Sequence, residues 1–212
     1  MSRILNINTN LQAALREAAG VIARGGVIVY PTETLYGLGA DALNPAAVRN
    51  VLAVKKRKDD KPILAIVNSV EMLRRVVAYV PESAEHLMQA FWPGPLTLVF
   101  MASAHVPKEL TQSTGTIGVR IPSHPFCLEL VERCARPLTS TSANIAGEPP
   151  HRSIEEIRRA LTEGVELFLD AGPLPESKPS TVVSVIHDPP KLLREGVIDI
   201  DRLRDVLPAI QT

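Results

Sequence analysis

Hydroxyl-bearing and cationic side chains gather in four short clusters at the ends of predicted strands or helices. The clusters are residues 32–34, Lys55 with Arg57, residues 140–144, and Ser180 with Thr181. Hydroxyl, ammonium and guanidinium groups donate hydrogen bonds to anions, and open α/β sheets bind ligands beyond the carboxyl ends of their strands. The clusters therefore predict an anion-binding site assembled at strand ends.

Two arginines lie at strand-like segments that should otherwise be buried, Arg120 after one apolar run and Arg194 at the end of another. A guanidinium near buried backbone needs an anionic partner, and it binds phosphate or carboxylate through two parallel hydrogen bonds. The sequence neighbours of Arg120 offer it no charge partner, which favours a bound phosphate or carboxylate. The alternative is a structural ion pair with Glu33, Asp41 or Asp170.

Several standard catalytic motifs are absent from the sequence. It has no GxxxxGK[ST] loop, no GxGxxG after a strand, and no GxSxG turn that would make Ser140 or Ser142 a hydrolase nucleophile. The five histidines form no ligand spacing with each other or with cysteine, and no Asp/Glu cluster suits two metals. We therefore expect no metal held by protein side chains, and any Mg²⁺ to arrive with a nucleotide.

The polar residues 32–34 follow a run of β-branched and aromatic residues, 27–30, that is typical of a strand buried on both faces. Pro31 ends this strand because it has no N–H for the sheet. Gly37 and Gly39 permit a positive φ or a close approach of backbone. Similarly, residues 138–141 are predicted to form a strand that leads into Ser142 and Asn144.

Strand-like and helical patterns alternate along the chain, and several neighbouring segments resemble hairpins. This arrangement predicts an α/β fold with a mixed, twisted sheet and flanking helices, in a single domain over 1–212. The expected strands are 4–7, 27–30, 63–67, 96–101, 116–121, 138–141, 167–170, 182–186 and 191–194. The expected helices lie near 11–22, 45–52, 69–78, 84–91, 125–135, 153–161 and 200–206.

The amino-acid composition limits the kinds of partner that the protein can bind. Lys plus Arg equals Asp plus Glu at 23 each, so any basic site must be local rather than a global field for nucleic acid. No apolar run approaches the roughly 20 residues of a membrane span, and the first ten residues lack a signal-peptide pattern. Cys127 and Cys134 lie about 10 Å apart along one predicted helix, too far for a disulfide. We expect a cytoplasmic protein without a membrane partner.

Seven motifs together resemble the YrdC family, in order and over nearly the whole chain. The motifs are PTETLYGLGAD (31–41), Lys55-x-Arg57 with Pro62, WPGPLT (92–97), GVRIPSHP (118–125), STSAN (140–144), STVV (180–183) and LLREG (192–196). The resemblance implies a YrdC-like twisted sheet with a large, positively lined concave cavity, in its single-domain form.

The resemblance also implies an activity, threonylcarbamoyl-AMP synthesis from L-threonine, bicarbonate and ATP with release of pyrophosphate. This is the first step towards threonylcarbamoyladenosine at position 37 of tRNAs that read ANN codons, and it implies downstream tRNA threonylcarbamoyl transferase partners. By motif position, the threonine site consists of Thr32, Arg120 and Ser140. The ATP site consists of Lys55 and Arg57, which are also the catalytic cations, with Thr116, Ser142 and Arg194. Asn144, Ser180 and Thr181 are expected as cavity lining.

Three alternatives stay open from the sequence. The first is an RNA-binding protein, disfavoured by zero net charge and few aromatic residues for base stacking. The second is a hydrolase built on the 140–144 serines, and the third is a paralogue of the same fold without synthase activity. Lys55 and Arg57 are expected in an exposed charged loop, 55–61, where they serve the nucleotide and not the fold.

Overall fold

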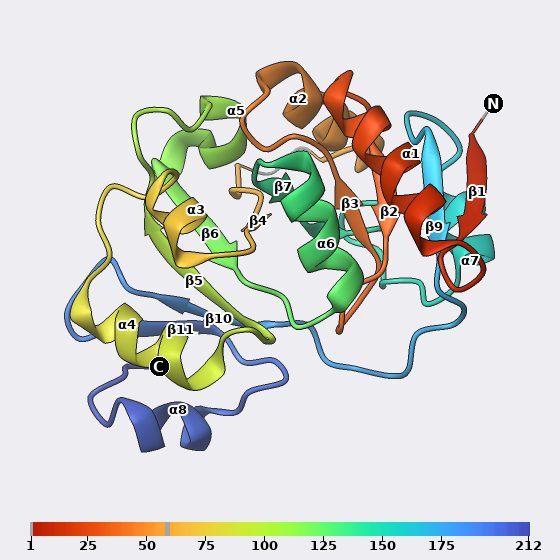
Figure 1. Cartoon of the computed structure of the whole chain (residues 1–212). Coiled ribbons are helices and arrows are strands. Elements are labelled where there is room, and N and C mark those ends of the chain that lie inside the picture. Colours follow the sequence, from red (N-terminus) through yellow and green to blue (C-terminus); the bar gives the residue numbers. More distant parts are fainter. Residues whose placement is uncertain (1, 58–59) are drawn as a thin grey trace.

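The computed structural model describes residues 2–57 and 60–212 (Figure 1), so Lys58 and Asp59 of the predicted charged loop lie outside the described residues. The helical elements are α1 (Leu11–Ala23), α2 (Pro45–Val54), α3 (Val70–Arg74), α4 (Glu82–Phe91), α5 (Lys108–Thr111), the 3₁₀ turn η1 (Gln112–Thr114), α6 (Pro125–Cys134), α7 (Ile154–Ala160) and α8 (Ile200–Val206). The strands are β1 (Arg3–Asn6), β2 (Ile28–Tyr30), β3 (Gly37–Gly39), β4 (Ala65–Ile66), β5 (Leu96–Met101), β6 (Thr116–Arg120), β7 (Leu138–Thr139), β8 (Thr141–Ser142), β9 (Leu167–Asp170), β10 (Thr181–Ser184) and β11 (Lys191–Arg194).

Across residues 2–57 and 60–212 the strands form two mixed sheets. The order is β1-β9-β2-β3-β8 in the five-stranded sheet and β11-β10-β5-β6-β4-β7 in the six-stranded sheet. Each contains both parallel and antiparallel neighbours, such as β2 parallel to β9 and antiparallel to β3. The predicted mixed α/β fold is confirmed, but its strands are divided between two sheets.

Residues 138–142 connect the two sheets. The sequence predicts one strand at 138–141, whereas the structure has β7 beside β4 in one sheet and β8 beside β3 in the other. Ser140 lies between them, and its backbone N–H donates to the carbonyl of Leu64 at 2.9 Å. This segment therefore brings the ends of both sheets together at one serine.

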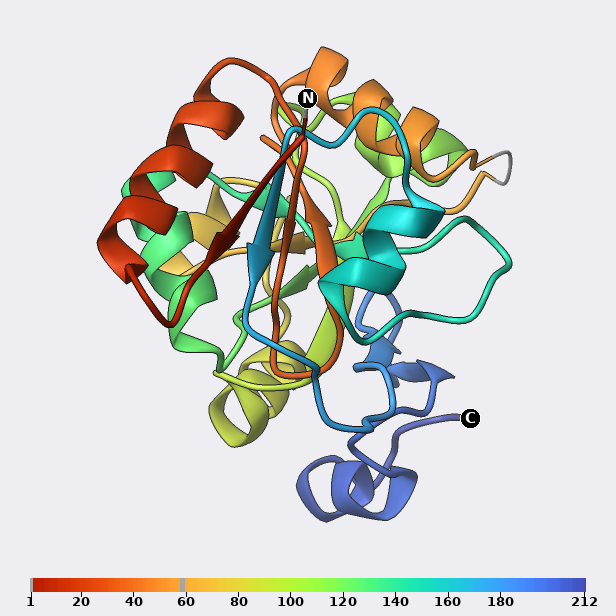
Figure 2. The same cartoon turned by 90° about the vertical axis from the view of Figure 1, so that its right-hand side faces the viewer.

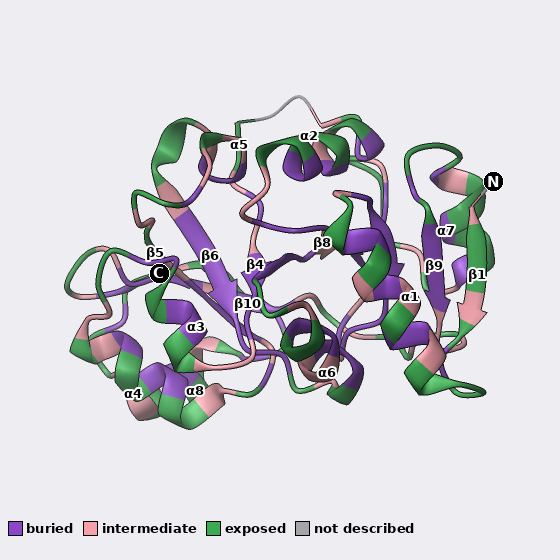
Figure 3. Cartoon of the chain, turned by 45° about the horizontal axis from the view of Figure 1, so that its top comes forward, coloured by how far each residue is buried: buried purple, intermediate pink, exposed green. Residues whose placement is uncertain are grey.

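Helices cover the sheets with one buried face each, whereas most central strands are buried throughout (Figure 3). Viewed from the side, α1 and α7 lie on opposite sides of the five-stranded sheet (Figure 2). α6 lies beside α1, and α8 lies beside α4 near the C-terminus (Figure 1). No helix in the described part of the chain is long and apolar enough to cross a membrane.

Local signals in the sequence locate most helix starts. Asn10, Asn44 and Ser69 each accept a backbone N–H at the start of α1, α2 and α3, and Ser153 forms the predicted capping box with Glu156. Elements α5 and β3 were not predicted. β3 was missed because its glycines have low strand propensity, yet pairing with β2 holds them extended.

Candidate functional site

A cavity of about 130 Å³ lies where the two sheets meet. Its walls come from the β2–β3 connection, the end of β6, the 140–142 segment and the entry and exit of β10 and β11. Six of the residues predicted for the site line it: Thr32, Arg120, Ser140, Ser142, Ser180 and Arg194. Tertiary structure thus collects hydroxyl and guanidinium groups that are up to 162 positions apart in the sequence.

Thr32 shapes the turn after β2. Its hydroxyl donates to the carbonyl of Leu35 at 2.6 Å and accepts the backbone N–H groups of Thr34 and Leu35 at 3.2 and 3.1 Å. Pro31 ends the strand, and Thr32 then closes the turn on itself. This fixed turn presents Glu33 and Thr34 to the end of β6.

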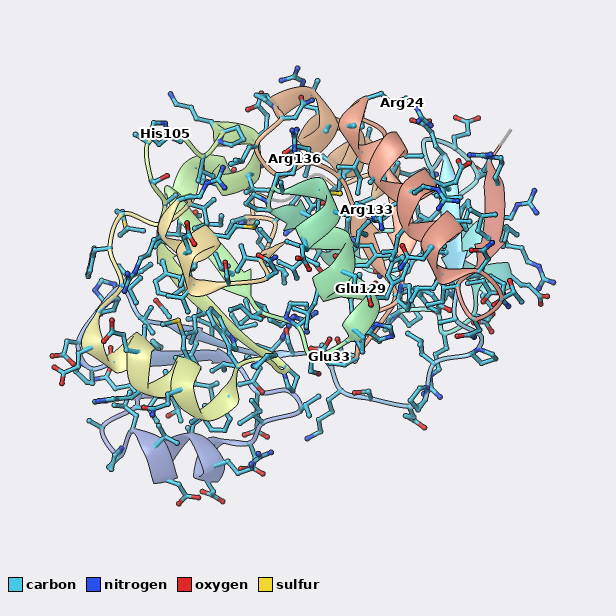
Figure 4. All side chains as sticks on the ribbon, viewed as in Figure 1. Arg24, Glu33, His105, Glu129, Arg133 and Arg136 are labelled. Atoms are coloured by element: carbon cyan, nitrogen blue, oxygen red, sulfur yellow. The ribbon has the colours of Figure 1, made fainter. Side chains whose placement is uncertain are left out.

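Arg120 is the last residue of β6 and is only 3% exposed. Its Nη1 lies 3.3 Å from Oε1 of Glu33 and 3.4 Å from Oγ1 of Thr34. The ion pair with Glu33, left open as an alternative by the sequence, is therefore present. Glu33 lies near the first turn of α6 (Figure 4), 87 positions before Arg120, which is why local sequence did not identify it as the partner.

Arg194 provides a second guanidinium in the cavity wall. Its Nε and Nη2 donate to the carbonyl of Ser180 at 3.2 and 2.8 Å, and Nη2 also contacts Oγ of Ser180 at 3.2 Å. Burial lowers the pKa of Arg194, and the positive charge of Arg120 lowers it further. Two guanidiniums that repel each other across one cavity favour an anionic ligand.

Lys55 is buried, only 4% exposed, so the expectation of an exposed position is wrong. Its Nζ donates to the carbonyls of Ser142 and Asn144 at 2.6 and 3.0 Å, and to Oδ1 of Asn144 at 3.4 Å. The reason is that α2 ends at Val54 with Lys55 as its C-cap, which directs the side chain inward. Lys55 therefore anchors the 142–144 turn from behind the cavity.

The other predicted site residues do not line this cavity. Arg57 is partly buried beyond the end of α2, and Thr116 lies at the opposite end of β6 from Arg120. Asn144 is buried and donates to the carbonyls of Ile145 and Glu148, which closes the next turn. Thr181 is fully buried, and its hydroxyl binds the backbone of residues 196 and 198. Their assigned ligand roles stay predictions.

Sequence reasoning did not single out the apolar residues of the cavity wall, among them Leu35, Leu64 and Pro179. None of these three carries a chemical group that could have marked it. A larger hollow of about 1020 Å³ lies elsewhere, beside α2 and α7. Its Arg24 is already paired with Glu166 at 2.6 Å, and it contains none of the predicted site residues. We therefore assign the site to the smaller cavity between the sheets.

Metal-binding groups do not gather in the part of the chain that the structure describes, where no three His, Cys, Asp or Glu side chains could hold an ion together. Both cysteines are free thiols, and Sγ of Cys127 donates to the carbonyl of Pro31. Burial strongly raises the pKa of Cys127. A thiol with a raised pKa is a poor nucleophile, and the polar side chains that line the cavity carry guanidinium and hydroxyl groups.

Comparison with known proteins gives consistent matches. The Sua5/YciO/YrdC family model, described as "Telomere recombination", matches residues 20–196. A Pyrococcus abyssi protein named threonylcarbamoyl-AMP synthase is 37% identical over 212 residues, covering 100% of this chain and 62% of the relative. This chain thus spans less than two thirds of that relative's length.

Solved structures agree with the sequence matches. The P. abyssi Sua5 structure complexed with L-threonine is 38% identical with a TM-score of 0.89, covering 93% of this chain and 58% of that one. Escherichia coli YciO is 30% identical with a TM-score of 0.85, covering 96% of this chain and 100% of that one. On a family match over most of its length, supported by these relatives, the chain belongs to the Sua5/YciO/YrdC family.

Proposed function

We propose that this protein is an L-threonylcarbamoyladenylate synthase, a nucleotidyltransferase that acts in threonylcarbamoyladenosine modification of tRNA. The observation that carries the proposal is the convergence of Arg120, Arg194 and three serine hydroxyls on one cavity. The relatives named for this activity, and the P. abyssi Sua5 structure complexed with L-threonine, support it.

The proposed reaction joins anions. The threonine amine and bicarbonate form a carbamate with loss of water, a carbamate oxygen attacks the α-phosphorus of ATP, and pyrophosphate leaves. The protein must hold two negatively charged reactants together and stabilise the charge that develops at phosphorus. Guanidinium and hydroxyl donors provide such stabilisation, and no covalent nucleophile is required.

The size of the cavity supports separate places for the two substrates. Pockets for drug-sized ligands measure about 300 to 1,000 Å³, so 130 Å³ holds an amino acid but not ATP as well. We place threonine inside, with its carboxylate on Arg120 and with Thr32 and Ser140 beside it. The nucleotide then lies towards Ser142 and Arg194, over the turn that Lys55 anchors, with Arg57 and Thr116 as further predicted contacts.

Other components follow from this chemistry. Mg²⁺ would accompany the phosphates of ATP, because the described side chains offer no three-ligand metal group. The product is an activated carbamate, so a transferase that acts on tRNA must consume it. We place the protein in the cytoplasm with these partners.

The test is pyrophosphate release from ATP by the purified protein. We expect release only when both L-threonine and bicarbonate are present, together with a product of the mass of threonylcarbamoyl-AMP. ATP turnover that is indifferent to threonine would contradict the synthase assignment. Absence of any turnover with normal folding would favour the paralogue without synthase activity.

A further inference from the structure

The carboxylate of Glu33, next to the cavity, lacks hydrogen-bond partners in the described part of the chain. Both carboxylate oxygens of Glu33 and Nε of Arg120 are buried without a hydrogen-bond partner among residues 2–57 and 60–212. Buried polar groups in native proteins are nearly always satisfied, so such a group indicates a functional or strained position. Here three of these atoms belong to one ion pair at the site.

Glu33 is the acid that balances the charge at this end of the cavity. The guanidiniums of Arg120 and Arg194 both line the cavity, and the positive charge of Arg120 adds to the lowering of the Arg194 pKa that burial causes. Burial lowers the pKa of His124, and the negative charge of Glu33 opposes this shift. Without Glu33, the buried guanidinium of Arg120 would face Arg194 with nothing to compensate it.

The contacts leave part of Arg120 available. Glu33 and Thr34 both meet Nη1, at 3.3 and 3.4 Å, whereas Nε has no acceptor. A guanidinium has five N–H donors in a rigid plane, so fixing Nη1 fixes the direction of the others. Glu33 is not among the residues that line the cavity, so it reaches the ligand only through Arg120.

We infer that Glu33 is a positioning residue for threonine, holding the Arg120 guanidinium in the plane in which it receives the substrate carboxylate. The inference rests on the proposed function. Glu33→Gln keeps the shape but replaces a charge-assisted contact by a weaker neutral one. The positive charge of Arg194 then repels the Arg120 guanidinium, which no longer keeps its orientation.

The experiment compares steady-state constants of the full chain. For Glu33→Gln we expect the threonine KM to rise roughly tenfold, with the ATP KM and kcat changed less than about threefold. The matched control is Asp41→Asn, another buried carboxylate paired with an arginine, 2.6 Å from Arg136 and outside the cavity. It should lower the melting temperature similarly but leave the threonine KM unchanged.

A double-mutant cycle shows whether Glu33 acts through Arg120. In an Arg120→Gln background, adding Glu33→Gln should change threonine affinity, measured by calorimetry, less than about twofold. The double variant should melt above Arg120→Gln alone, because it no longer leaves a carboxylate buried without its partner. Glu33→Asp retains the charge but withdraws the carboxylate, so it should raise the threonine KM even if Glu33→Gln folds poorly.

Two results would overturn the inference. One is an unchanged threonine KM in both Glu33 variants, which makes the ion pair purely structural. The other is a full, independent loss from Glu33→Gln in the Arg120→Gln background, which puts Glu33 in direct contact with the substrate. If the wild type itself releases no threonine-dependent pyrophosphate, the proposed function fails. If the wild type is active and the Glu33 variants keep its threonine KM, only the inference about Glu33 fails, so the two failures are distinguishable.

Discussion

Lys55 brings an ammonium group into the interior, where it meets three oxygen acceptors of the 142–144 turn. Burying an ammonium is costly unless its donors are satisfied, and here the turn supplies the acceptors. Lys55 therefore has a structural role in addition to its predicted contact with ATP. The turn in question carries Ser142, so loss of Lys55 should alter the site and the fold together.

Replacing Lys55 with Met should remove all three hydrogen bonds and leave buried carbonyls unsatisfied. The cost should be about 2 to 4 kcal/mol of the free energy of unfolding, which lowers the melting temperature by roughly 5 to 15 °C. Differential scanning calorimetry measures it, with Lys56→Ala at the adjacent exposed position as a control that shifts by less than about 2 °C. Equal melting temperatures for Lys55→Met and wild type would contradict the anchoring role.

His124 should make stability depend on pH. Its buried Nδ1 has no partner among the described residues, and burial lowers its pKa in the folded state, opposed by the charge of Glu33. As pH falls below the unfolded value of 6.5, the unfolded chain binds the proton first, so the free energy of unfolding decreases. Above that pH, the contribution of His124 to the free energy of unfolding is constant.

Urea unfolding of the wild type and of His124→Gln between pH 5 and pH 8 tests this prediction. This range extends about 1.5 pH units to either side of the histidine pKa in the unfolded chain. The wild type should lose stability relative to the variant on the acid side, by at most about 1.4 kcal/mol per pH unit. His105→Gln, at an exposed position, serves as the control. Parallel curves for wild type and His124→Gln would show that this histidine does not titrate differently on folding.

The β2–β3 hairpin is the element that presents Thr32, Glu33 and Thr34 to the cavity. The Tyr30 ring of β2 can pack on the backbone of β3 because Gly39 has no side chain. A Cβ there would lie 2.7 Å from Cε1 and 2.9 Å from Cδ1 of Tyr30, which is fully buried and donates to the carbonyl of Thr139 at 3.1 Å. Of the two sequence expectations for this glycine, a positive φ or a close approach at its backbone, the structure shows the second, with the Tyr30 ring against Gly39.

Gly39→Ala should therefore destabilise the protein by about 1 to 3 kcal/mol, since Tyr30 cannot move without losing its packing. Gly20→Ala is the matched substitution, in an exposed position of α1 where the nearest atom lies 4.0 Å away. It should stabilise by about 0.5 to 1 kcal/mol, because alanine is the better helix former. Denaturant titration of both variants should give changes of opposite sign, and a neutral Gly39→Ala would show that the hairpin tolerates a side chain.

At the scale of the whole molecule, equal numbers of acidic and basic residues predict weak RNA binding. We expect a labelled tRNA to bind with a weak salt dependence, since few phosphates are neutralised. A plot of the logarithm of the association constant against the logarithm of salt concentration, between roughly 50 and 200 mM, should have a slope shallower than about −3. An unrelated RNA of the same length should bind equally well. A steep slope with submicromolar affinity for tRNA at physiological salt would instead support the alternative that this is an RNA-binding protein.

Sequence alone determined the parts of this protein that depend on neighbours along the chain. Helix caps at Asn44 and Ser153 satisfy backbone groups within three residues, and apolar strands such as β5 and β9 follow from local burial, so these elements were predicted. The sequence also predicts Arg120 and Arg194 as anion-binding groups, and both line the cavity. Only the tertiary structure decided that Glu33 pairs with Arg120 and that Lys55 is buried beneath residues 142–144. Such contacts join segments up to 89 positions apart, and which buried charge meets which is settled by how the two sheets meet, not by local sequence.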